Sequence, residues 1–240
     1  MDKKILLIIP AYNEQECILG VYEKITEYNS RTDTPYDVIV INDGSTDDTE
    51  KILTGSAIPH IRLIRNLGIG GAVQTGYMYA AMKGYDVAVQ FDGDGQHEIS
   101  CVSDLAAPIL SGEADMVIGS RFVDRDRENF RSTFARRVGI NILSFFIKLF
   151  TGRKIYDPTS GFRACGRELT AFFAENYPTE YPEPVSEVAA LRQGYTVQER
   201  HAVMHERQGG TSSIRAWKSA YYMINVTIAM FMERIRKRPK

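Results

Sequence analysis

Residues 87–97 read VAVQFDGDGQH, and this stretch decides the fold class. Its first five residues are almost all apolar, without the polar–apolar alternation of a strand that has one face in water. Continuous hydrophobicity over a short run is typical of a strand buried on both faces, as in a parallel sheet. Asp92 and Asp94 follow at once, separated by a single glycine. The stretch therefore predicts a buried strand that ends in an acidic turn.

Three earlier segments, 5–9, 38–41 and 61–64, show the same continuous hydrophobicity. Segments with helical patterns separate them, and one of these begins in the glycine run at Gly68 and continues through Met82. Alternating strands and helices predict an α/β fold with a doubly wound, mostly parallel, Rossmann-like sheet and helices on both faces.

Two of the predicted helices carry possible start signals. Asn13 precedes Glu16 by three residues, which resembles a capping box. Ser45 precedes Asp48 at the same spacing, and we expect Ser45 to cap the helix that follows it.

The second half of the chain has a different organisation. A short strand is predicted at 116–118, and an arginine-rich loop runs from there to Arg137. Further elements are an apolar helix at 140–150, a turn at 157–162, a helix at 187–193 and an edge strand at 197–204. We divide the chain into a domain over 1–215 and a C-terminal apolar helix with a basic tail over 216–240.

Composition excludes several classes of function. The 240 residues carry a formal net charge of −1, which gives no indication of a nucleic-acid partner. Cys17, Cys101 and Cys165 lie far apart, so they predict neither a disulfide framework nor a structural zinc site. No run reaches the roughly 18–20 apolar residues of a membrane span, and we expect no signal peptide. A cytoplasmic protein is predicted.

Polar side chains gather where the predicted strands end, which is where open α/β sheets bind their ligands. They are Asn13, Glu14, Asn42, Asp43, Ser45, Asn66, Asp92 and Asp94. Two carboxylates one residue apart suit Mg²⁺ or Mn²⁺, which take hard oxygen ligands and keep positions for phosphate oxygens. A tight turn of structural value alone is the other interpretation of the Asp-Gly pattern.

Seven short motifs follow one another along the chain. They are Pro10–Glu14 (PAYNE), Asn42–Asp47 (NDGSTD), Asn66-x-Gly68, Asp92–Gln96 (DGDGQ), Gly119–Arg121 (GSR), Asp157–Arg163 (DPTSGFR) and Arg207-x-Gly209-Gly210-x-Ser212. The first four resemble the inverting family 2 glycosyltransferases. The last three resemble the polyprenyl-phosphate branch of that family, to which dolichyl-phosphate mannose synthase belongs. The resemblance covers about residues 5–215 and implies a GT-A fold and sugar transfer from a nucleotide-sugar.

The resemblance also implies roles for individual residues. Those that would bind the nucleotide-sugar are Pro10, Tyr12, Glu14, Asp43, Asn66, Gly68, Asp92 and Gln96. Asp92 and Asp94 would hold Mg²⁺ or Mn²⁺ against the diphosphate. The catalytic candidates are Asp94, Asp157, Arg121 and Arg207, with the arginines on phosphate groups and Asp157 as a possible base. His97 is left out, because a single histidine there is as easily a hydrogen-bonding neighbour.

Two acceptor chemistries are open. A lipid phosphate is already anionic and needs positive charge, for which the acceptor-binding candidates are Arg131, Arg136, Arg137 and Ser160. The apolar helix at 140–150 would then meet the lipid of polyprenyl phosphate. A hydroxyl of a lipid-linked saccharide, as in cell-surface polysaccharide assembly, would need a carboxylate base such as Glu183 or Glu187. UDP- and GDP-sugars are both open as donors.

An inactive binding or scaffold subunit is the alternative from another class of protein. The intact Asp43, Asp92 and Asp94 argue against it. The apolar segment at 219–232 and the basic residues after it are typical of a helix in the interface of an anionic membrane. The pattern equally suits docking on another subunit, as in a homo-oligomer, or on a small membrane protein. We predict a peripheral contact with the inner face of the cell membrane.

Overall fold

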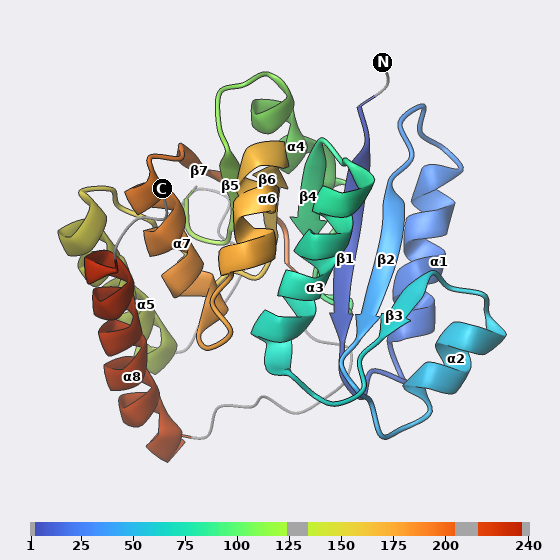
Figure 1. Cartoon of the computed structure of the whole chain (residues 1–240), viewed down its shortest axis with the longest axis horizontal. Helices are drawn as coiled ribbons and strands as arrows, with labels where there is room; N and C mark the ends of the chain where they lie inside the picture. Colours follow the sequence, from blue (N-terminus) through green and yellow to red (C-terminus); the bar gives the residue numbers. More distant parts are fainter. Residues whose placement is uncertain (1–2, 124–133, 205–215, 237–240) are drawn as a thin grey trace.

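The apolar runs of the sequence become the strands of one seven-stranded sheet in a computed structural model, which describes residues 3–123, 134–204 and 216–236 (Figure 1). The strands are β1 (Ile5–Ala11), β2 (Asp37–Asn42), β3 (His60–Arg62), β4 (Val87–Gln90), β5 (Met116–Ser120), β6 (Arg163–Gly166) and β7 (Val197–His201). Their order across the sheet is β3-β2-β1-β4-β6-β5-β7. β6 runs antiparallel to β4 and β5, and the other pairs are parallel. The predicted mostly parallel sheet is confirmed.

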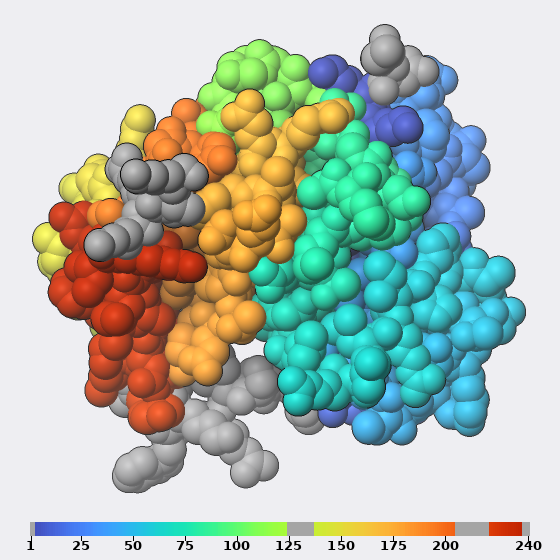
Figure 2. All heavy atoms as spheres, viewed as in Figure 1, coloured from blue at the N-terminus to red at the C-terminus, as the bar shows by residue number. Residues whose placement is uncertain are grey.

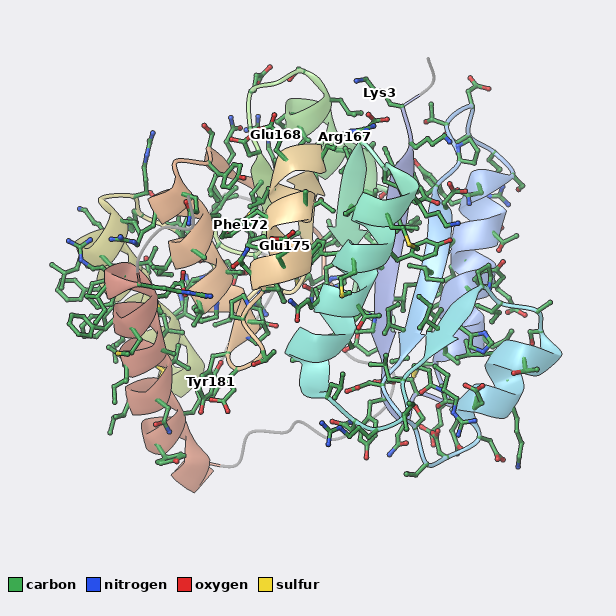
Figure 3. The ribbon with its side chains drawn as sticks, in the orientation of Figure 1. Lys3, Arg167, Glu168, Phe172, Glu175 and Tyr181 are labelled. Atoms are coloured by element: carbon green, nitrogen blue, oxygen red, sulfur yellow. The ribbon has the colours of Figure 1, made fainter. Side chains whose placement is uncertain are left out.

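Eight helices accompany the sheet in the described part of the chain. They are α1 (Ile18–Asn29), α2 (Thr49–Gly55), α3 (Gly68–Lys83), α4 (Cys101–Leu110), α5 (Phe134–Thr151), α6 (Arg167–Asn176), α7 (Pro182–Gln193) and α8 (Ala216–Ile235). Figure 1 shows α3 and α6 crossing the same face of the sheet. Arg167, at the start of α6 (Figure 3), donates to the Gly84 carbonyl and to Asp86, which joins this helix to the loop before β4.

Side chains of the central strands alternate between two cores, which explains their continuous hydrophobicity. On β1, Leu6 and Ile8 join the core under α3 and α6, whereas Leu7 and Ile9 join the core under α1, α2 and α4. All four side chains are buried. A strand covered on both faces has no position where a polar residue would meet water.

Both predicted capping boxes are wrong. α1 begins at Ile18 and α2 at Thr49, and neither N-cap residue, Cys17 or Asp48, makes a side-chain capping bond. Instead the two loops bond to each other, because the Asn13 amide donates to Ser45 Oγ and the Thr46 amide donates to Asn13 Oδ1. Asn13 has a φ of 57°, a left-handed conformation that asparagine tolerates. These polar residues therefore join the ends of β1 and β2.

α5, α7 and α8 form a group beside β5 and β7. Val226 and Met230 of α8 are fully buried in the same core as α3 and α6. Tyr181, labelled in Figure 3 just before α7, meets Tyr222 of α8 edge-on at 5.1 Å between ring centroids. The predicted boundary at residue 215 falls outside the described residues. Within the described ranges, no helix combines the length and hydrophobicity of a membrane crossing.

Candidate active site

The carboxyl ends of β1, β2 and β4 lie together, because these three neighbouring strands are parallel. In Figure 1 the arrowheads of β1 and β2 point to the same lower edge of the sheet. The loops that follow them carry Tyr12, Asp43 and Asp92. The sheet therefore collects the predicted donor-binding residues at one edge.

Asp43 connects the end of β2 to the start of α3. Its Oδ1 accepts the Leu67 amide at 2.7 Å, and its own amide donates to the Ala11 carbonyl at 2.8 Å. Burial raises the pKa of the Asp43 carboxyl, although the hydrogen bonds that it accepts from the Leu67 and Gly68 amides act in the opposite direction. Gly44 has a φ of +69°, and a Cβ there would lie 2.8 Å from the Asn66 amide nitrogen. The two loops therefore pack backbone to backbone.

The other predicted donor-binding residues surround this contact. Pro10 pairs with Ile41 in the sheet, and the next loop residue after β1, Tyr12, is 45% exposed. Asn66 Oδ1 accepts the Gly68 amide at 2.9 Å, where α3 begins. An exposed aromatic ring such as that of Tyr12 offers a stacking face for a planar group.

The acidic turn after β4 is closely packed. Asp94 is buried, and its Oδ1 accepts the Gln96 amide at 3.1 Å. Gly95 has a φ of +75°, and a Cβ on Gly93 would lie 3.3 Å from the Pro10 carbonyl oxygen. The turn therefore favours glycine at position 95 for its backbone conformation and leaves little room for a side chain at position 93.

Asp92 is bounded by two other parts of the chain. His97 Nε2 lies 3.0 Å from Asp92 Oδ2, so the histidine is a direct neighbour of this carboxylate. On another side, a Cβ at Gly161 would lie 3.1 Å from both Asp92 oxygens and 3.0 Å from Gln90 Nε2. The turn after α5 therefore approaches Asp92 as closely as a glycine permits.

The donor set of the turn fits a divalent metal that is bound jointly with a diphosphate. Asp92, Asp94 and Gln96 offer hard oxygen ligands within five residues. The described residues contain no cluster of three or more His, Cys, Asp or Glu that could hold a metal. Mg²⁺ commonly uses one or two carboxylates and takes its remaining ligands from substrate phosphates and water. The turn is suited to that mode of binding.

Arg121 and Asp157 form a bidentate ion pair at the end of β5. Arg121 Nε and Nη2 donate to the two Asp157 oxygens, each at 2.7 Å, and the Arg121 amide donates to Asp157 Oδ2 at 3.0 Å. Arg121 also donates to Thr159 Oγ1. Glu199 accepts the Asp157 amide at 2.9 Å, and burial raises the pKa of the Glu199 carboxyl. With Asp157 fully buried, this geometry orients Arg121 and does not leave Asp157 placed as a base.

A second buried pair lies at the other end of the same turn. Arg163 donates to the carbonyls of Ser160 and Glu183 and to Ser186 Oγ, and its Nη2 lies 3.5 Å from Glu187 Oε1. Burial raises the pKa of the Glu187 carboxyl well above its ordinary value. Glu187 is fully buried, so it is not placed to meet an acceptor hydroxyl. Ser160 is also buried, and its hydroxyl donates to the Gly119 carbonyl at 2.6 Å.

Two arginines lie near one aromatic ring where the acceptor is expected. The guanidinium carbon of Arg121 is 5.3 Å from the Phe122 ring centroid, and that of Arg137, in α5, is 4.7 Å from it. Arg131 and Arg207 lie outside the described residues, as does the side chain of Arg136.

Reasoning from the sequence assigned no role of their own to two contributors to this site, Gly161 and Glu199. It left His97 out as a possible hydrogen-bonding neighbour, and the structure places His97 beside Asp92 in that way. The contacts of these three residues join parts that are far apart in the chain, apart from the bond between His97 and Asp92. A signal for two of them was present, since Gly161 lies in the DPTSGFR motif and His97 directly follows DGDGQ.

The geometry agrees with a comparison of sequences. The family model described as glycosyl transferase family 2 matches residues 6–172, which include the acidic turn and the DPTSGFR turn. The chain belongs to glycosyl transferase family 2. It is a glycosyltransferase, and the predicted family resemblance is confirmed.

The names of several curated relatives of this glycosyltransferase specify a lipid phosphate. The UDP-N-acetylglucosamine–dolichyl-phosphate N-acetylglucosaminyltransferase of Methanococcus voltae is 32% identical over an alignment of 208 residues, which covers 79% of this chain and 80% of that protein. The polyprenol monophosphomannose synthase of Mycolicibacterium smegmatis is 27% identical over an alignment of 225 residues, which covers 88% of this chain and 81% of that protein.

Solved structures confirm the GT-A-like fold. Glucosyl-3-phosphoglycerate synthase from Mycobacterium tuberculosis, in complex with Mn²⁺ and UDP-glucose, matches with a TM-score of 0.67 and 21% identity. The match covers 97% of this chain and 79% of that one. The same enzyme in complex with phosphoglyceric acid matches with a TM-score of 0.66 and 24% identity.

Proposed function

We propose that this glycosyltransferase moves a hexose from a UDP- or GDP-sugar to the phosphate of a polyprenyl phosphate, with a divalent metal at the Asp92–Asp94 turn. Relatives whose names specify dolichyl or polyprenol phosphate support the acceptor. A neighbour of the same fold in complex with Mn²⁺ and UDP-glucose supports the donor class and the metal.

One observation about α5 carries the proposal. Near its start, Arg137 lies over the Phe122 ring beside the Arg121–Asp157 pair. Further along the same helix, Phe145 and Leu149 are 61% and 60% exposed. A cationic group and an exposed apolar face on one helix match the two parts of a lipid phosphate, an anionic head on a hydrocarbon chain.

The chemistry then needs orientation and charge more than a base. Asp92 and Asp94 would hold the metal, which supplies Lewis-acid neutralisation of the leaving diphosphate when bound. Arg121 is oriented by Asp157 before any substrate arrives, so its charge is preorganised. A phosphate oxygen is anionic already and attacks the anomeric carbon without losing a proton, so the ion-paired Asp157 and the buried Glu187 need not act as bases.

We also propose a peripheral contact between α8 and the inner face of the cell membrane. One face of α8 is exposed and apolar, and its residues are Tyr221, Ile224, Ile228, Phe231, Met232 and Ile235. Figure 2 shows α8 along one edge of the molecule, away from α1 and α2. Basic residues end the helix and continue after it in the sequence, which favours anionic lipid.

Flotation with liposomes tests this contact. Wild-type protein is expected to float with vesicles that contain anionic lipid, and Ile228→Glu to remain behind, because a charge on this face opposes insertion. Met82→Glu, at a 74% exposed position on α3, is the matched control and should float like wild type. Equal flotation of both variants would remove α8 from the membrane contact.

A transfer assay tests the reaction itself. Labelled UDP- and GDP-sugars are incubated with the protein, Mn²⁺ or Mg²⁺, and undecaprenyl phosphate in detergent. A chloroform-soluble product that mild acid hydrolyses is expected from one donor, and none after chelation of the metal. Donor hydrolysis without a lipid product would move the acceptor to a saccharide hydroxyl, and inert donors throughout would contradict transfer.

A variant pair tests the role of the acidic turn. Asp94→Asn is expected to abolish transfer, because its neutral side chain binds a divalent metal poorly, while the fold persists. Asp104→Asn, at an exposed position in α4, is the control and should retain full activity. Full activity in Asp94→Asn would end the metal role of Asp94.

A further inference from the structure

His97 lies in a closed aromatic setting at the end of the acidic turn. Its ring stacks on Phe162 with 4.6 Å between centroids and 20° between planes. Phe91 meets the His97 ring edge-on at 5.5 Å, and Phe91 also meets Phe162 at 88°. All three side chains are buried, and Phe162 is completely so. The imidazole is therefore held in one orientation by the packing of these rings.

The polar contacts of the imidazole explain why this position is not simply another phenylalanine. Nε2 lies 3.0 Å from Asp92 Oδ2, whereas Nδ1 has no hydrogen-bond partner in residues 3–123, 134–204 and 216–236. A buried nitrogen without a partner is unfavourable, and an apolar ring would avoid it. The histidine therefore contributes through Nε2 and its bond to Asp92.

Asp92 is positioned from two sides and still accessible. The carboxylate has His97 on one side and the Gly161 backbone on another. A Cβ added to Gly161 would lie 3.1 Å from the carboxylate oxygens. The Asp92 side chain keeps 31% of its surface exposed, compared with 3% for His97. The His97 backbone also pairs with Met204, which ties the acidic turn to the segment after β7.

We propose that His97 is a positioning residue that holds the Asp92 carboxylate in the orientation in which it receives the metal–diphosphate, and that Phe162 holds His97 for this purpose. The proposal rests on the proposed function, since it assumes the metal at this turn. Outer hydrogen-bond partners of ligating carboxylates typically change metal affinity or activity by about 10–100-fold when replaced.

Two amides of different length test the proposal. The Gln amide nitrogen reaches about as far as histidine Nε2, whereas the Asn amide nitrogen reaches only as far as Nδ1. His97→Gln should therefore keep the bond to Asp92, and His97→Asn should lose it. Both variants sacrifice the same stacking on Phe162, so a purely structural role would affect them alike. His60→Asn is the control, since His60 lies on β3 and bonds the Ile58 carbonyl.

The measurement is Mn²⁺ binding in the presence of UDP, followed by electron paramagnetic resonance, which needs no turnover. His97→Asn is expected to bind Mn²⁺ about 10–100-fold more weakly than wild type, and His97→Gln within a few-fold of wild type. Thermal unfolding confirms that each variant is folded, and His97→Phe, which keeps an aromatic ring, replaces His97→Asn if that variant is not. His97→Phe should then show the same loss of Mn²⁺ affinity.

The outcomes separate the two proposals. Wild-type affinity in folded His97→Asn or His97→Phe would overturn the positioning role while leaving the metal site intact. Equal losses in His97→Asn and His97→Gln would reduce His97 to a packing residue and also overturn it. Failure of the wild-type protein to bind Mn²⁺ with UDP would instead remove the metal from the proposed function.

Discussion

The DPTSGFR turn has a buried arginine–carboxylate pair at each end, and the two pairs differ in geometry. At the first end, Asp157 meets Arg121 through two bonds of 2.7 Å and also accepts the Arg121 amide. At the second end, Arg163 and Glu187 are 3.5 Å apart. In the described residues, Arg163 Nε and Glu187 Oε2 have no hydrogen-bond partner.

The difference shows that the same residue types do different work in one fold. Asp157 joins a side chain and a backbone amide of β5 to the turn, so its charge is well compensated. Arg163 works mainly through the carbonyls of Ser160 and Glu183, and Glu187 is a weak partner whose pKa burial raises. The first pair depends on both charges, whereas the second depends mainly on the arginine.

The largest effect is expected from Asp157→Asn. It leaves Arg121 buried beside a neutral amide. This amide has one acceptor oxygen, whereas the carboxylate uses two oxygens to accept both guanidinium bonds and the Arg121 backbone amide. Breaking one partner of a buried ion pair typically lowers the free energy of unfolding by about 3–5 kcal/mol. Urea denaturation measures the change, and transfer activity should fall with the loss of Arg121 orientation. If Asp157→Asn lowered the free energy of unfolding by less than Glu187→Gln does, the comparison between the two pairs would be reversed.

Arg163→Met is expected to have a smaller effect, about 1–3 kcal/mol, because it strands the Ser160 and Glu183 carbonyls. Adding Glu187→Met should recover part of the loss, since replacing a buried pair by apolar residues is often nearly neutral. The double replacement of Arg121 and Asp157 by Met should not recover, because the Arg121 amide also loses its acceptor. Urea denaturation compares each double variant with the single variant at the same end of the turn, Arg163→Met or Asp157→Asn. Equal recovery of the free energy of unfolding at both ends would contradict the comparison.

Gly161→Ala tests the middle of the turn. The added Cβ would meet Gln90 Nε2 at 3.0 Å and Asp92 at 3.1 Å, so the turn or the carboxylate must move. Overpacking of this kind typically destabilises by about 1–3 kcal/mol, and displacement near 1 Å can slow a reaction about 100-fold. Gly20→Ala, with open space around its Cβ position in α1, is the control for stability and for transfer. Unchanged transfer would show that Asp92 tolerates the contact.

Among these variants, Glu187→Gln is expected to change the free energy of unfolding least at pH 5, because its amide mimics the protonated acid. Because burial raises the folded pKa of Glu187, the unfolded chain ionises first as pH rises above the ordinary value of 4.5. The folded wild-type protein then binds more protons than the unfolded chain, so its free energy of unfolding falls with rising pH in this window.

Glu187→Gln lacks this proton, so it should gain stability relative to wild type as pH rises above about 5, by at most about 1.4 kcal/mol per pH unit. Denaturation at several pH values measures the difference, in which the raised pKa values of Asp43, Glu183 and Glu199 are common to both proteins. A difference that does not change with pH would mean that Glu187 is ionised in the folded state.

Local patterns predicted most of the sheet, and the failures have a common cause. The segments at 87–91 and 68–82 match β4 and α3 closely, because buried strands and long helices have their own periodicity. β6 was not predicted, since its four residues continue directly from a turn and pair antiparallel between β4 and β5. The capping boxes at Asn13 and Ser45 failed because each side chain accepts a backbone amide of the other loop, Ser45 Oγ from Asn13 and Asn13 Oδ1 from Thr46.

The sequence by itself determined the fold class, the family and the acidic turn, because each depends on residues that are close together in the chain. Only the tertiary structure decided the partners of the charged groups. Asp157 meets Arg121 across 36 residues, and Asp43 meets Leu67 across 24. Spacing along a chain specifies periodicity and turn chemistry, whereas a buried charge takes the partner that packing brings to it, and that partner comes from elsewhere in the sequence.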